Sequence, residues 1–127
     1  MPEIFDKTIL IVDDLEDLRD PPAKYFLKKG FKNVFKAANS KEAFEIIEKI
    51  KPNLIILDIQ LKEGDVNGIE ILRRIKAGLS PDSIVVMLSG HRGLYEDECA
   101  KLGAVEFWEK PILLNVLTDN VKRVLSI

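Results

Sequence analysis

The chain has 127 residues, of which 46% are hydrophobic and 31% are charged, and 19 basic and 21 acidic side chains leave a net charge of −2. This balance predicts one globular domain, residues 1–127, and argues against a disordered chain. It gives no reason to expect direct binding to nucleic acid or to a membrane. One cysteine excludes an internal disulfide, and the N-terminus lacks a signal-peptide pattern, so a cytoplasmic location is expected.

Five short runs rich in β-branched or aromatic residues predict strands, and none is long enough to span a bilayer. The runs at 8–12, 54–57 and 84–88 are apolar at nearly every position, which is typical of strands buried on both faces. The runs at 33–38 and 104–108 are weaker, and we expect them nearer the edges of the sheet.

The segment after the first run has a helical pattern but contains Pro21 and Pro22. An interior proline costs a helix about 3 kcal/mol, because it removes a backbone hydrogen bond and clashes with the preceding turn. Asp20 can instead cap a new helix that has Pro21 at its first position. We therefore expect two kinked or broken segments, 15–20 and 22–29.

Further helical patterns occupy the stretches 40–50, 67–78 and 111–125, the last of which opens with Pro111. Strands and helices thus alternate along the whole chain. Such alternation predicts an α/β fold with a doubly wound, five-stranded parallel sheet and helices on both faces.

In sheets of this type, ligands bind beyond the carboxyl ends of the strands. Polar residues stand at these ends in the predicted strands, in chain order Asp13 and Asp14, Asp58, Ser89 and Lys110. Because the ends of parallel strands meet at one edge, three carboxylates, a hydroxyl and an ammonium are expected to converge there.

Three close carboxylates repel one another unless a cation offsets their charge. Oxygen ligands of this kind suit Mg²⁺. Lys110 adds a fixed positive charge and Ser89 a rotatable hydroxyl donor, and both suit phosphoryl oxygens. A carboxylate nucleophile in this setting predicts phosphoryl transfer to an aspartate.

Each of these residues also has a purely structural interpretation. Asp13 and Asp14 can cap a helix, Ser89 can belong to a turn, and Lys110 can be a solvated lysine before a proline. The functional prediction rests on the order in which the polar positions follow successive strands.

The chain resembles, from end to end, the receiver domain of two-component response regulators. The matching motifs are "ILIVDD", "PNLIILDIQL", "NGIEILRRIK", "IVVMLSGH" and "GAVEFWEKPI". The resemblance implies the flavodoxin-like strand order 2-1-3-4-5. It implies a signalling switch that accepts a phosphoryl group from a sensor histidine kinase or phosphotransfer protein, and not a conventional turnover enzyme.

By this resemblance, Asp58 is the phospho-acceptor. The Mg²⁺ ligands are Asp58 itself, the acidic pair Asp13 and Asp14, and the backbone carbonyl of Gln60.

Ser89 and Lys110 match the family's hydroxyl residue and lysine, and Phe107 matches its switch aromatic, although it can also be a simple core residue. Phosphorylation would draw Ser89 toward the new oxygens and let Phe107 rotate into the vacated space. The fourth helix, fifth strand and fifth helix would then carry the output to an effector protein or output domain, or form a homodimer. The Lys110–Pro111 peptide is implied to be cis.

Two features depart from the family. One is the pair of prolines in the first helix, which in this family often contacts the kinase. The other is the loop 59–68, which is slightly longer than usual, lacks a proline and is made acidic by Glu63 and Asp65. This loop is either a tolerated surface insertion or a change in access to the phosphoryl group.

The only histidine, His91, is either a surface residue or a candidate base.

Three other functions are open to comparison. A phosphatase of the haloacid dehalogenase type needs a second aspartate two residues after its nucleophile, where Glu16 stands. A flavodoxin-like FMN binder needs a phosphate loop rich in glycine and hydroxyl residues, whereas "DDLEDL" would repel phosphate. A phosphorylation-independent interaction module with a receiver-like fold stays open because of the two departures.

Overall fold

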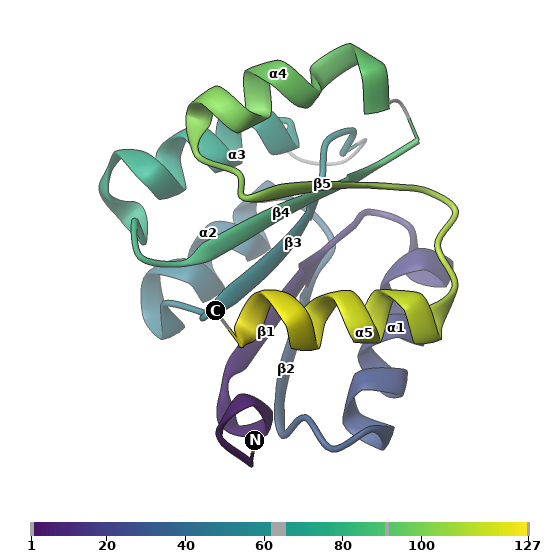
Figure 1. Ribbon diagram of the computed structural model, residues 1–127. Coiled ribbons are helices and arrows are strands. Elements are labelled where there is room, and N and C mark those ends of the chain that lie inside the picture. The colour runs from purple at the N-terminus through teal and green to yellow at the C-terminus, as the bar shows by residue number, and fades with distance from the viewer. Residues whose placement is uncertain (1, 62–65, 91, 127) are drawn as a thin grey trace.

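The computed structural model describes residues 2–61, 66–90 and 92–126. Within these residues, five parallel strands form one sheet in the predicted order, β2-β1-β3-β4-β5 (Figure 1). The strands are β1 (Thr8–Val12), β2 (Asn33–Ala37), β3 (Leu54–Asp58), β4 (Ile84–Ser89) and β5 (Glu106–Glu109). The helices are α1 (Glu16–Lys28), α2 (Ser40–Ile50), α3 (Gly68–Arg74), α4 (Arg92–Leu102) and α5 (Leu114–Leu125), with a 3₁₀ helix η1 (Pro2–Asp6) and a π-helical turn η2 (Ile75–Leu79).

The burial of the strands follows their sequence patterns. Every residue of β3 is buried, as its continuous apolar run predicts, whereas β2 lies at an edge and buries only Ala37 fully. β5 forms the other edge. The two weaker runs are therefore the edge strands, as expected.

Two helical layers sandwich the sheet, each closing its own hydrophobic core. α1 and α5 lie side by side on one face, where Phe26, Leu117 and Val121 pack on the sheet (Figure 1). α2, α3 and α4 cover the opposite face, where Ile47 and Ile71 pack. A parallel sheet needs both covers, because both of its faces are apolar.

Neighbouring residues of β5 belong to different cores. Phe107 packs in the core under α2, α3 and α4, and Trp108 packs in the core under α1 and α5. The Trp108 Nε1–H donates to Glu106 Oε1 at 2.7 Å, and Arg123 Nη2 donates to the same oxygen at 2.8 Å. These contacts tie β5 to α5.

The prediction that the prolines break the first helix into two segments was wrong, whereas a kink at the prolines stays a prediction. α1 is one helix that contains Pro21 and Pro22. It begins after Leu15, whose carbonyl oxygen accepts hydrogen bonds from the N–H groups of Leu18 and Arg19.

Tertiary packing explains why α1 continues through the prolines. Pro22, Ala23 and Phe26 are buried, so a break would expose apolar surface to water. The missing N–H groups would have bonded the carbonyl oxygens of Asp17 and Leu18. Both of those residues are exposed, so water can reach their carbonyls instead.

Two other helix boundaries differ from expectation. α5 begins at Leu114 rather than at Pro111, and its first turn is closed by the Leu117 N–H bonding the Leu113 carbonyl. α3 passes into η2, where Gly78 has a φ of 151°, a conformation that favours glycine.

Among the described residues, no helix has the length and apolar character to cross a membrane.

We predict that Pro21→Ala stabilises the protein. Pro21 is exposed, so alanine restores an N–H facing the Asp17 carbonyl without removing a buried contact. The free energy of unfolding should rise by about 1–2 kcal/mol, because the helix penalty of proline exceeds its restriction of the unfolded chain. Urea denaturation measures this against Lys24→Ala, an exposed control on the same helix. A variant no more stable than the wild type would contradict the prediction.

Candidate functional site

The predicted polar residues lie at neighbouring strand ends along one edge of the sheet. In the register of the sheet, Val12 at the end of β1 pairs with Leu57, so Asp13 leaves the sheet beside Asp58. Asp58 pairs with Leu88, and Ser89 is the next and last residue of β4. The backbone of the sheet therefore brings these positions together.

Three carboxylates converge at this edge. One ligand oxygen from each of Asp13, Asp14 and Asp58 lies within 4.8 Å of the other two. Asp13 and Asp58 are only 2% and 8% exposed, and Asp14 is half-buried. The predicted acidic cluster is thus present, with one member that faces solvent more than the others.

Lys110 lies between two of these carboxylates. Its Nζ is 2.9 Å from Asp13 Oδ2 and 3.5 Å from Asp58 Oδ1. Its backbone N–H also donates to the Ser89 carbonyl at 2.9 Å, which fixes the start of the chain after β5. The peptide bond to Pro111 is cis, as the resemblance implied.

Burial dominates the protonation of Asp58. Desolvation of its carboxylate raises the pKa to about 6, although Lys110 acts in the opposite direction. The charges of Asp13 and Asp14 raise the pKa further. When it is ionised, the carboxylate at the end of β3 therefore needs a neutralising partner.

Asp13 is held at four polar atoms. Its N–H donates to the Ala37 carbonyl at 3.1 Å, and its Oδ1 accepts from the Leu15 N–H at 3.0 Å. Its Oδ2 accepts from Lys110, and its carbonyl oxygen accepts from Arg19 Nη1 at 3.0 Å. The N-cap of α1 is Leu15, so neither Asp13 nor Asp14 occupies the capping position that their structural interpretation assigned to them.

The remaining predicted residues lie near this cluster in sequence and in the sheet. Ser89 is 2% exposed, and Phe107 is 8% exposed and packed under α4. Gln60 follows β3 by two residues and has an exposed side chain. The functional roles given to these residues by the family resemblance stay predictions.

Two residues of the acidic loop and the histidine lie outside the described part of the chain. These are Glu63, Asp65 and His91. Both interpretations of the loop, a tolerated surface insertion and a change in access to the phosphoryl group, therefore stay predictions.

Sequence reasoning missed two residues that contact the site backbone. At Gly68, an added Cβ would lie 2.1 Å from the Asp58 carbonyl oxygen, so the start of α3 can approach the end of β3 only as glycine. Arg19 donates to the Asp13 carbonyl across the first turn of α1. Both contacts depend on tertiary approach, and the only sequence signal was a glycine at the start of a predicted helix.

The donor set fits a divalent cation. It offers carboxylate oxygens without sulfur or imidazole, which suits a hard cation such as Mg²⁺ more than zinc or copper. The nearby ammonium of Lys110 is placed to balance further negative charge.

Comparisons with known proteins agree with this arrangement. The family model described as "Response regulator receiver domain" matches residues 9–122. Sporulation initiation phosphotransferase F of Bacillus subtilis is 32% identical over 124 residues, which are 98% of each chain. The nitrogen assimilation regulatory protein NtrX of Azorhizobium caulinodans is 36% identical over 119 residues, 93% of this chain and 26% of that protein. The solved receiver domain of NtrX from Brucella abortus superimposes with a TM-score of 0.85 and 33% identity, over 93% of this chain and 98% of that one.

We predict that Asp58 destabilises the metal-free protein as pH rises. The folded state holds the Asp58 proton up to about pH 6, whereas an unfolded chain releases it near the ordinary value of 3.8. Between these values the folded state binds more protons, so the free energy of unfolding falls with increasing pH. The loss is at most about 3 kcal/mol, and solvent near the side chain reduces it.

Asp58→Asn removes this titration without changing the size of the side chain. Urea denaturation in chelator from pH 4 to pH 8 should show a steeper decline for the wild type, and the variant should be the more stable protein at pH 7. Parallel pH profiles for the two proteins would contradict a buried Asp58 with a raised pKa.

Proposed function

Since this chain belongs to the response regulator receiver domain family, we propose that it is a phosphorylation-dependent signalling switch whose acceptor is Asp58. Receiver domains bind Mg²⁺ at a cluster of acidic residues, and the cluster here is formed by Asp13, Asp14 and Asp58. The observation that carries the proposal is the placement of Lys110 against Asp13 and Asp58 within this cluster.

The proposed reaction is a transfer to a carboxylate oxygen of Asp58. That oxygen attacks the phosphorus of the donor, a P–N bond of phosphohistidine or a P–O bond of a small acyl phosphate breaks, and an acyl phosphate forms. The attacking carboxylate must be ionised, so a pKa of about 6 leaves it reactive at neutral pH. A bound Mg²⁺ would supply neutralisation of charge on the transferred group.

In the proposed mechanism, Lys110 neutralises negative charge both before and after phosphoryl transfer. In the structure its ammonium pairs with Asp13 and lies 3.5 Å from Asp58. After transfer, Asp58 would carry roughly two negative charges by analogy with other phospho-residues, and the ammonium can turn to those oxygens. Ser89, buried at the end of the next strand, is the proposed hydroxyl donor to the same group.

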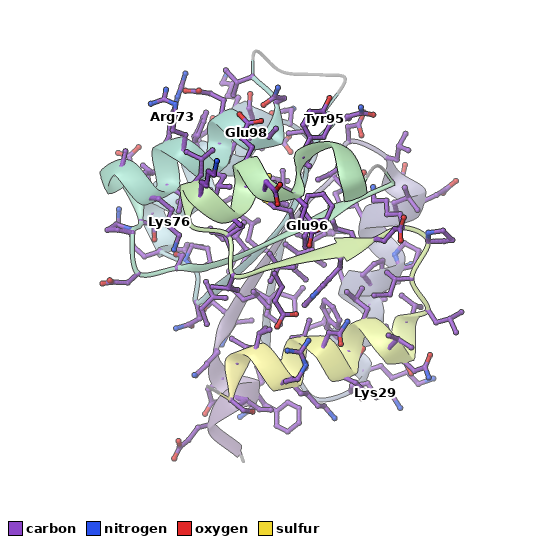
Figure 2. The ribbon with its side chains drawn as sticks, turned by 45° about the horizontal axis from the view of Figure 1, so that its top comes forward. Lys29, Arg73, Lys76, Tyr95, Glu96 and Glu98 are labelled. Atoms are coloured by element: carbon purple, nitrogen blue, oxygen red, sulfur yellow. The ribbon has the colours of Figure 1, made fainter. Side chains whose placement is uncertain are left out.

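The proposed output follows from the movement of Ser89. Its shift toward the phosphoryl oxygens would let Phe107 change position under α4. Figure 2 looks onto this side of the molecule, with Tyr95, Glu96 and Glu98 on α4 above β5. We propose that this surface of α4, β5 and α5 binds the effector, an output domain or a second copy of the chain.

The proposed phosphodonor is a sensor histidine kinase or phosphotransfer protein. A groove of about 430 Å³ lies beside Lys110 between α1 and α5, and its lining is mainly apolar, including Pro22, Leu88, Pro111 and Leu117. The first helix often contacts the kinase in this family, and an apolar groove beside Lys110 suits an apolar side of a donor helix.

We predict that Mg²⁺ binds at the three carboxylates and that Asp14→Asn weakens binding by at least about tenfold, because a direct ligand is lost. Isothermal calorimetry measures the affinity. Asp17→Asn is the matched control, since it removes an exposed carboxylate from the following helix. Equal affinities for wild type and Asp14→Asn would leave Asp14 without a role in metal binding.

We predict that Asp58 is the residue that accepts phosphate. Incubation with acetyl phosphate and Mg²⁺ should add one base-labile phosphoryl group, detected by intact mass, and chelation of the metal should abolish it. Asp58→Asn should gain nothing, because its amide is not a nucleophile here. Asp119→Asn, which removes an exposed aspartate on α5, should be labelled like the wild type.

Labelling of Asp58→Asn at the wild-type rate would overturn the receiver mechanism. If neither protein is labelled by acetyl phosphate or by a kinase, the phosphorylation-independent interaction module becomes the better description.

A further inference from the structure

Arg19 reaches back from α1 to the end of β1. Its Nη1 donates a hydrogen bond to the backbone carbonyl of Asp13 at 3.0 Å, and its side chain is only 16% exposed. The contact does not belong to the α1 backbone ladder. It joins the helix directly to the residue that carries one of the three clustered carboxylates.

The guanidinium is itself oriented by neighbours. Arg19 Nε lies 3.5 Å from Asp20 Oδ1, and Lys36 Nζ on β2 lies 3.1 Å from the same oxygen. The hydrogen bond from Lys36 lowers the pKa of Asp20, so this carboxylate is ionised at neutral pH. Arg19 is thus held between a fixed anion and a backbone carbonyl.

The prolines make this contact more important than it would be in an ordinary helix. Pro21 and Pro22 have no N–H, so the carbonyls of Asp17 and Leu18 lack their normal partners four residues on. The first turn of α1 is consequently joined to the rest of the helix by fewer backbone hydrogen bonds. A side-chain contact from Arg19 to Asp13 fixes that turn against the sheet.

We propose that Arg19 is a positioning residue for the metal site, holding the loop of Asp13 and Asp14 in the geometry that binds a divalent cation. This inference rests on the proposed function, in which those carboxylates are metal ligands. Outer contacts of this kind orient a ligand group without touching the metal, and their loss commonly weakens metal binding by tenfold or more.

The test compares Arg19→Gln and Arg19→Lys with wild type by Mg²⁺ calorimetry. Arg19→Gln should weaken Mg²⁺ binding about tenfold, because the amide side chain is too short to reach the same carbonyl. Arg19→Lys retains a long cationic donor and should recover much of the affinity. Arg73→Gln is the control, since Arg73 is an exposed arginine that pairs with Glu70 on α3.

A second readout needs no metal. The Leu15 N–H donates to Asp13 Oδ1 at 3.0 Å. The exchange rate of this amide, measured in the presence of a chelator, therefore reports the order of the Asp13–Asp14 loop. Exchange measured by NMR should be faster in Arg19→Gln than in wild type and unchanged in Arg73→Gln. Amides in β3 should keep their protection, which separates a local change from general destabilisation.

A third experiment uses the prolines of α1. Pro21→Ala restores one backbone hydrogen bond to the first turn, so Arg19→Gln should cost less Mg²⁺ affinity in the Pro21→Ala background than in the wild type. This double-mutant cycle measures the coupling directly. A strictly additive cycle would overturn the link between the prolines and Arg19.

Equal Mg²⁺ affinity and equal Leu15 exchange in Arg19→Gln and wild type would overturn the positioning role. A wild type that binds Mg²⁺ but accepts no phosphate would instead contradict the proposed function, since neither of these two readouts requires phosphoryl transfer.

Discussion

The contact of Lys110 with Asp13 and Asp58 is the interaction on which the site depends. Two like charges 4 Å apart cost about 4 kcal/mol at an effective dielectric of 20, so three clustered carboxylates are a strained arrangement. The ammonium at 2.9 Å and 3.5 Å relieves part of this repulsion. Three carboxylates less one ammonium still leave two negative charges when all are ionised, which is the charge that one divalent cation balances.

The sheet supplies the rigidity that this charge cluster needs. Asp58 closes a strand that is buried at every position, so the packed core holds the backbone that carries its carboxylate. Asp13 is fixed through its backbone on one side and through Lys110 on the other. The site therefore combines a stable apolar platform with an electrostatically unfavourable edge, and this edge is where we propose that the cation binds.

Sequence reasoning was reliable where local pattern decides the outcome. The strands around 8–12, 54–57 and 84–88 were recognised because burial on both faces leaves a continuous apolar run. The acidic cluster followed from the rule that strand ends meet at one edge. The polar residues themselves could be named because they interrupt those apolar runs.

It failed where the outcome depends on partners distant in sequence. The break in α1 was predicted from the local cost of proline, but the burial of Pro22 and Phe26 is a property of the folded protein. Gly68 and Arg19 each touch a backbone carbonyl of the site, and no periodicity reveals which carbonyl a side chain or a turn will approach.

The alternation along β5 has a mechanical consequence. Phe107 and Trp108 are consecutive but are embedded in the two opposite cores, and Glu106 joins the indole of Trp108 to Arg123 of α5. A rotation of β5 about its own axis cannot displace one aromatic ring without displacing the other. Under the proposed switch, a movement of Phe107 would therefore be transmitted through the sheet to Trp108, and the fluorescence of the Trp108 indole would report on changes beneath α4.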